Sequence, residues 1–213
     1  MNDTLAWYVN KQVERTIVNL EKHNMDVFFV NDEQALKEKI TQLLLPHSTV
    51  AIGDSMTLYE TGLMDFLRSG SYHFLDKHRP GITSAEKKEI YRQTFSADTF
   101  LCSTNALTEE GELYNIDGNG SRVAAMLYGP AQVILIAGIN KIVKNLAAAE
   151  QRVRHYAAPL DAKRLGKDTP CTKLGYCVDC QSDNRICNDF VVIRRQFTKG
   201  RIKVMIVNKA LGY

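Results

Sequence analysis

The chain has 213 residues, of which 45% are hydrophobic, so it can bury one sizeable core. Its formal net charge of +3 is mild, and it contains no dense basic run interleaved with aromatic residues. Nucleic acid is therefore not expected as a partner. The nearest basic cluster lies between positions 194 and 203 and is typical of the solvated face of a hairpin.

No stretch of the sequence approaches the ~20 apolar residues that a membrane-spanning helix needs. Residues 1–20 also lack the basic start and apolar stretch of a secretory signal. We therefore expect a cytoplasmic protein with no membrane partner. Because cytosolic thiols are kept reduced, the five cysteines favour a metal or redox centre over a disulfide framework.

The first half of the chain alternates between helical and strand patterns. Apolar residues recur at helical spacing over residues 1–20 and 36–44, and Pro46 ends the second of these helices. Short apolar runs predict strands at residues 27–30, 49–52, 72–75 and 99–102. Two more helices are expected, one from residues 53–57 to about residue 69, the other from the capping-box sequence at 83–86 to about residue 94.

The second half of the chain continues this alternation. A hairpin is predicted over residues 105–116, a helix after 118–122, a strongly apolar strand over 132–137, and a helix that ends near Pro159. Residues 190–197 and 202–207 flank a turn and predict a C-terminal β-hairpin. The fold class is therefore α/β, with a parallel-rich sheet covered by helices on both faces. We expect a single domain over residues 1–213, with a cysteine-rich loop at 168–189 inserted before the hairpin.

Four of the five cysteines lie within 17 positions and follow the pattern C-x5-C-x2-C-x6-C. A C-x2-C pair lets two thiolates bind one ion or cluster from a tight loop, and the flanking cysteines complete four soft ligands. The predicted metal ligands are Cys171, Cys177, Cys180 and Cys187. The irregular spacing and the lack of a nearby histidine favour a [4Fe–4S] cluster over zinc. Free thiols and a disulfide switch are the remaining alternatives.

Three glycine-containing loops leave apolar strands and enter helices, at residues 53–57, 118–122 and 138–141. Loops of this kind gather at the carboxyl edge of a parallel sheet, where ligands bind. Each loop taken alone is more typical of a capped helix start, and Arg122 could instead pair with Asp117 or Glu112. Together they predict a pocket for a carboxylate or phosphate. Its expected residues are Gly53, Asp54, Ser55, Thr57, Asn105, Gly118, Asn119, Gly120, Ser121, Arg122, Gly138, Asn140 and Lys141.

The sequence does not indicate which groups would perform catalysis. It contains neither the P-loop nor the dinucleotide-binding fingerprint, so ATP and NAD are not expected. Ser55 has no evident histidine partner, and the surrounding residues do not form a G-x-S-x-G elbow. The catalytic residues therefore remain unknown.

Three ordered segments, at residues 105–113, 117–123 and 137–143, together with the closing Leu-Gly-Tyr, resemble the signature of the LUD (lactate-utilisation) domain family. The cysteine segment resembles a largely uncharacterised branch of it. The resemblance implies a fold similar to the sugar-phosphate isomerase and CoA-transferase group. It also implies a link with oxidation of L-lactate to pyruvate alongside iron–sulfur partner proteins. No glutamate matches the nucleophile of the CoA-transferases.

Three functions are compatible with these features. The first is a redox accessory protein that binds a small anionic metabolite and a cluster or metal, and exchanges electrons with a redox partner protein. The second is an isomerase or CoA-transferase-like enzyme acting on a phosphorylated or CoA-linked substrate, with a structural zinc site. The third is a metal-stabilised interaction module whose C-terminal hairpin would pair with a second copy to form a homodimer.

Overall fold

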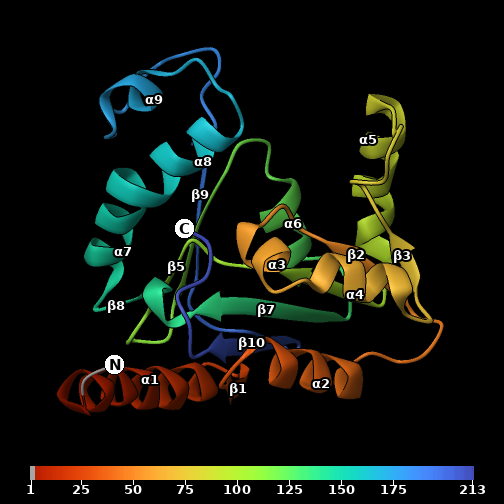
Figure 1. Cartoon of the computed structure of the whole chain (residues 1–213), viewed down its shortest axis with the longest axis horizontal. Coiled ribbons are helices and arrows are strands. Elements are labelled where there is room, and N and C mark those ends of the chain that lie inside the picture. The colour runs from red at the N-terminus through yellow and green to blue at the C-terminus, as the bar shows by residue number, and fades with distance from the viewer. Residues whose placement is uncertain (1–2) are drawn as a thin grey trace.

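A computed structural model describes residues 3–213 as two β-sheets with helices packed around them (Figure 1). The strands of the larger sheet are all parallel and lie in the order β1 (Asp26–Val30), β10 (Ile202–Val207), β7 (Gln132–Gly138), β4 (Thr99–Cys102), β2 (Thr49–Ile52) and β3 (His73–Leu75). The smaller sheet has the order β8 (Ile142–Val143), β5 (Ala106–Thr108), β6 (Leu113–Asp117) and β9 (Asp189–Ile193). In the smaller sheet β5 pairs with β8 in parallel, whereas β6 pairs antiparallel with both β5 and β9.

The larger sheet is buried on both faces, as its continuous apolar strands predict. In β7, Val133 and Leu135 belong to one core cluster, and Ile134 and Ile136 belong to the other. Successive side chains of a strand point to opposite faces, so a strand between two cores must be apolar throughout. The predicted α/β fold with helices on both faces is confirmed.

One face of the larger sheet is covered by α2 (Glu33–Leu43), α3 (Met56–Glu60) and α4 (Leu63–Ser69). Leu36 and Leu58 are buried there against the strands. The sequence predicted one continuous helix from residues 53–57 to about residue 69, and this was wrong. Gly62 lies between α3 and α4 with a φ of +66°, a left-handed conformation that interrupts the helix.

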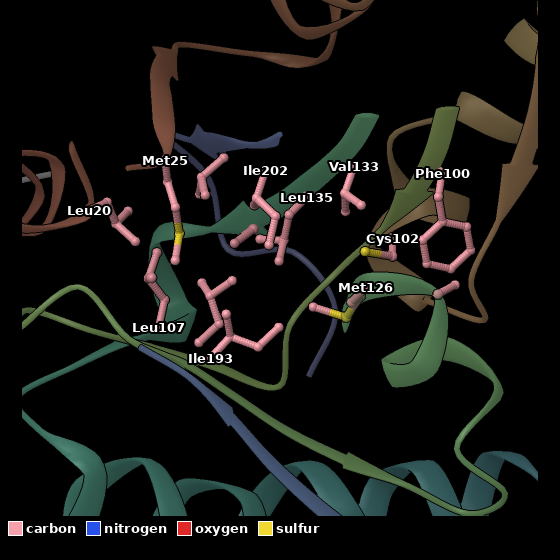
Figure 2. Packing of buried hydrophobic residues seen from close by; sticks show 14 of the residues in the cluster. Leu20, Met25, Phe100, Cys102, Leu107, Met126, Val133, Leu135, Ile193 and Ile202 are labelled. Atoms are coloured by element: carbon pink, nitrogen blue, oxygen red, sulfur yellow. The ribbon is translucent and has the colours of Figure 1, made fainter. Parts of the chain in front are cut away.

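The opposite face is covered by α1 (Asp3–Lys22), α6 (Ser121–Leu127) and the smaller sheet. Figure 2 shows Leu20 of α1, Met126 of α6 and Leu107 of β5 around Leu135 in this core. On the far side of the smaller sheet lie α7 (Leu146–Arg152), a π-helical turn (Val153–Ala157) and α8 (Ala158–Arg164). The helix therefore passes through Pro159 rather than ending there, because the π-helical turn precedes the proline and α8 begins beside it.

The remaining helices are α5 (Ser84–Gln93), which stands apart in Figure 1, a 3-10 turn at Thr94–Ser96, and the short α9 (Pro170–Leu174) in the cysteine segment. The capping box that begins α5 is confirmed, because Thr83 and Glu86 bond each other's backbone. No helix within residues 3–213 combines the length and apolar character required to cross a membrane.

The predicted C-terminal hairpin is wrong, because β9 and β10 belong to different sheets. Ile193 of β9 pairs with β6, whereas β10 lies between β1 and β7. The connecting segment crosses the end of α1, where the backbone N–H of Gln196 donates to the carbonyl of His23 (2.9 Å). Because β10 is apolar on both faces, only a central position in a parallel sheet buries it fully.

Candidate functional site

A cavity of about 450 Å³ lies at the carboxyl ends of β2, β4 and β6, beside the end of α8 and the cysteine segment. Its volume falls within the range of small-molecule sites. The three strand-end loops predicted from the sequence do come together here. Eight of the thirteen predicted residues line the cavity, namely Asp54, Ser55, Asn105, Gly118, Asn119, Ser121, Arg122 and Lys141.

The other five predicted residues, Gly53, Thr57, Gly120, Gly138 and Asn140, do not line the cavity. Two of the glycines instead allow chain segments to pack closely. A β-carbon at Gly138 would lie 2.5 Å from the carbonyl oxygen of Lys209, and one at Gly53 would lie 3.2 Å from Cγ of Arg122. Asn140 holds the same segment in place, because its Oδ1 accepts from the N–H of Leu211 (3.0 Å).

Arg122 lines the cavity, but all its guanidinium N–H groups have protein acceptors. Nε donates to Asp117 (2.9 Å), Nη1 to the carbonyl of Ser103 and to Asn115, and Nη2 to Asn105 and the carbonyl of Ile116. Asp117 also accepts from the first N–H groups of α6. Arg122 therefore ties together the ends of β4, β5 and β6, and the first turn of α6 is capped by the protein itself.

Lys141 ends the 3-10 turn Ile139–Lys141 that follows β7, and it is 2% exposed. Its Nζ donates to Oγ1 of Thr57 (3.0 Å), Oγ of Ser103 (3.0 Å) and the carbonyl of Thr104 (3.2 Å). Among the described residues no carboxylate lies within ion-pair distance of this amine. It is thus a buried amine with polar partners but no counter-ion.

The pKa of Lys141 is lowered to about 7. Burial is the main cause, since a charged ammonium loses its hydration, and the positive charges of Arg152 and Arg122 add to it. Arg152 is fixed nearby by the carbonyls of Asn140 and Asn105. A fraction of Lys141 is therefore neutral at physiological pH.

Asp54 lies at another side of the cavity, within ion-pair distance of Lys77 (3.3 Å) and His78 (2.8 Å). Burial by itself would raise the pKa of Asp54, but the bond with His78 and the charge of Lys77 outweigh burial and hold that pKa well below its usual range. Lys77 is itself 4% exposed and lies over the ring of Tyr91. Asp54 is thus an ionised carboxylate that neutralises a buried lysine.

Several cavity residues were missed by the sequence analysis. Ser103 and Thr104 directly follow β4, so the strand-end rule that selected the other loops could have found them. Arg164 and Lys167, at the end of α8, had no comparable signal. The lining contains five basic side chains against three aspartates: Arg122, Lys141, Arg164, Lys167 and Arg185, with Asp54, Asp117 and Asp161.

The four clustered cysteines, Cys171, Cys177, Cys180 and Cys187, all line a second and smaller cavity, of about 30 Å³. Cys187, with its neighbours Arg185 and Ile186, also lines the larger cavity, so the two cavities share a wall. Cys102 lies apart in the core, where burial raises the pKa of its thiol to about 12. Cys102 thus packs as a small apolar core residue.

The cysteine cavity contains polar and charged groups suited to sulfur ligands. The N–H of Asp179 donates to Sγ of Cys177 (3.3 Å), and the hydroxyl of Thr169 lies 3.2 Å from Sγ of Cys171. Burial raises the pKa of Cys187 to about 11, and the neighbouring cysteines add to this effect. Across residues 3–213, however, no three cysteine, histidine or acidic side chains are grouped closely enough to hold a metal ion.

A six-stranded parallel sheet with helices on both faces and a polar cavity at its strand ends defines the chain as an α/β protein. The LUD domain family model matches residues 13–207, so the chain belongs to the LUD domain family, which is associated broadly with lactate utilisation. The resemblance to the LUD family noted in the sequence is confirmed, whereas the branch suggested by the cysteine segment stays a prediction.

The solved structures that match the chain include the following two. A DUF162 family protein from Deinococcus radiodurans matches with a TM-score of 0.50 and 12% identity, covering 93% of this chain and 98% of that one. At this identity the match shows a shared fold. The δ subunit of eIF2B from Chaetomium thermophilum matches with a TM-score of 0.36 and 14% identity, over 68% of this chain and 56% of that one. No curated protein matches the sequence.

Proposed function

We propose that this protein binds a small organic anion in the larger cavity, next to a metal centre held by Cys171, Cys177, Cys180 and Cys187. In this proposal it is a cytoplasmic redox accessory protein of the lactate-utilisation type. It would exchange electrons with a partner protein through that centre.

The observation that carries the proposal is the shared wall between the two cavities. Arg185, Ile186 and Cys187 face both of them, so a centre bound by the cysteines would lie directly beside a ligand at the strand ends. Arg185 also fixes the backbone of the cysteine segment, donating to the carbonyls of Cys180 and Cys187. This arrangement supports a functional link between the ligand and the centre.

The anionic nature of the ligand follows from the charges of the larger cavity. Its basic side chains outnumber its acidic ones, and all three aspartates already pair with protein cations, Asp161 with Arg164 (2.7 Å). Asp54 pairs with Lys77, and Asp117 pairs with Arg122 (2.7 Å). Among the described residues no carboxylate lies within ion-pair distance of the Lys167 amine, so this side chain can attract the carboxylate of a ligand.

The donor set of the smaller cavity fits a thiolate-bound centre. Four thiols face one space, a backbone N–H already donates to one sulfur, and Arg154 and Arg185 can offset the charge of four thiolates. When bound, an iron–sulfur cluster would supply one-electron transfer. The irregular spacing of the four cysteines in the sequence favours a cubane cluster over zinc. Zinc is the alternative occupant.

Anaerobic purification followed by iron, sulfide and zinc analysis tests the proposal. We expect iron and sulfide in the protein, with visible charge-transfer absorption. Both should be lost in Cys177→Ser and retained in Cys102→Ala, which removes a thiol that lies outside the cluster of four. A colourless protein that contains stoichiometric zinc would contradict the electron-transfer function.

A further inference from the structure

Lys141 lines the larger cavity, although the residue is almost fully buried. Ser103 and Thr104, two of its three hydrogen-bond partners, line the same cavity. The third partner, Thr57, lies behind it. A ligand that fills the cavity would therefore meet the amine together with a serine hydroxyl.

The surroundings of Lys141 suit a neutral amine as well as a charged one. An ammonium group has three donors, and Thr57, Ser103 and the carbonyl of Thr104 can accept all of them. A neutral amine has two donors and one lone pair. Because a hydroxyl can also donate, Ser103 or Thr57 can reverse its hydrogen bond and satisfy that lone pair.

The charges around Lys141 favour the neutral form. Arg152 and Arg122 both oppose its protonation, whereas Glu60 and Asp161 favour protonation more weakly. Lysines that act as nucleophiles are activated in this way, by burial and by a neighbouring cation. The arrangement thus has two features that amine catalysis requires: an amine that can lose its proton, and a place in the wall of a cavity large enough for a ligand.

We propose that Lys141 forms an imine with the carbonyl group of a small oxo acid bound in the larger cavity. This inference deepens the proposed function and rests on its anionic ligand: the carboxylate of the oxo acid would lie toward Lys167, and its carbonyl carbon toward Lys141.

The condensation involves no change of oxidation state. The lone pair of Nζ attacks the carbonyl carbon and forms the C–N bond, and the carbonyl electron pair moves to oxygen. The two protons that the amine loses leave with that oxygen as water, and a C=N double bond remains. Ser103 and Thr57, each 3.0 Å from Nζ, are placed to pass these protons between nitrogen and oxygen.

Borohydride trapping tests the inference directly. The full-length protein is incubated with glyoxylate or pyruvate, reduced with sodium borohydride, and analysed by intact mass and peptide mapping. We expect one reduced adduct, located at Lys141, at a level at least about tenfold above that at any surface lysine, because a surface amine is almost wholly protonated at neutral pH. An adduct spread over surface lysines, with none at Lys141, would overturn the inference.

Two variants and two further compounds complete the test. Lys141→Arg should abolish the adduct, whereas Lys144→Arg, which changes an exposed lysine outside the cavity, should retain it. If Lys141→Arg does not fold, peptide mapping of the wild-type protein still decides the result. Acetone, which lacks a carboxylate, should give much less adduct than pyruvate. If lactate raises the melting temperature but pyruvate is never trapped, the imine is disproved while anion binding stands; if neither compound binds, both proposals fail.

Discussion

Arg122 and Asp117 form an ion pair in which Nη2 lies 2.7 Å from a carboxylate oxygen, at the point where β6 passes into α6. Both side chains are about nine-tenths buried, and the remaining donors of Arg122 reach the ends of β4 and β5. The pair therefore fixes the geometry of one side of the cavity. The N–H groups of Arg122 that hold this geometry are therefore not free to bind a ligand.

Replacing Arg122 by lysine should lower the free energy of unfolding by about 2–4 kcal/mol, because an ammonium cannot reproduce five directed N–H groups and would leave buried acceptors without partners. Urea denaturation measures the change. Arg92→Lys, at a residue whose side chain is 69% exposed, is the matched control and should change stability by less than about 0.5 kcal/mol. Equal effects of the two substitutions would contradict the structural role of Arg122.

Gly138→Ala should destabilise the protein by about 1–3 kcal/mol, since its β-carbon would lie within 2.5 Å of Asn140 Oδ1 and the carbonyl oxygen of Lys209. Gly118→Ala is the control, because the nearest atom to its new β-carbon is 3.5 Å away. Thermal unfolding of the two variants gives the comparison. A Gly138→Ala protein as stable as Gly118→Ala would show that the segment after β10 does not pack closely against this turn.

Lys141 should make stability depend on alkaline pH. Its pKa is about 7 in the folded chain and 10.5 when unperturbed, so between these values the unfolded state binds more protons. Stability should therefore rise with pH across that window, by a few kcal/mol in total. In Lys141→Met this rise should disappear. Urea unfolding at several pH values measures the slope, and a wild-type slope no larger than that of the variant would contradict the lowered pKa.

Asp54 should make stability rise with pH in the acid range as well, because its folded pKa is also lowered. Its folded pKa lies below the ordinary 3.8, so the stabilisation is fully present above that value and is lost as pH falls below it. The Asp54→Asn variant should be less stable than the wild type at pH 7, because Lys77 then lacks its counter-ion. On acidification from pH 7, the variant should lose less stability than the wild type does. Acid titrations followed by circular dichroism of both proteins test this; parallel curves would contradict it.

Much of the fold follows from local sequence patterns. Ile134 and Ile136 alternate with Val133 and Leu135 in one apolar run, and this predicted a strand buried on both faces. The position of β10 could not be predicted in this way, because it depends on which distant strands β10 pairs with. A turn sequence next to two apolar runs is typical of a hairpin, but only the packing of the whole sheet shows that β10 inserts between β1 and β7.

The sequence predicted where the site lies but not which side chains in it are available to a ligand. Strand-end loops identified Lys141 and Asp54, but a sequence does not show which donors are already used within the protein. Arg122 was therefore expected to hold a ligand, whereas it holds the chain. Lys77 lies far from Asp54 in sequence, and no local pattern links the two residues. The approach of Cys187 to the strand-end cavity is likewise a property of tertiary structure.

The most direct test of the account is the electron paramagnetic resonance spectrum of the anaerobically purified, reduced protein, recorded with and without lactate or pyruvate. The shared wall around Cys187 predicts a cluster signal that shifts when the anion enters the neighbouring cavity. A protein with no such signal, or a signal that saturating anion leaves unchanged, would contradict the claim that ligand and centre are neighbours.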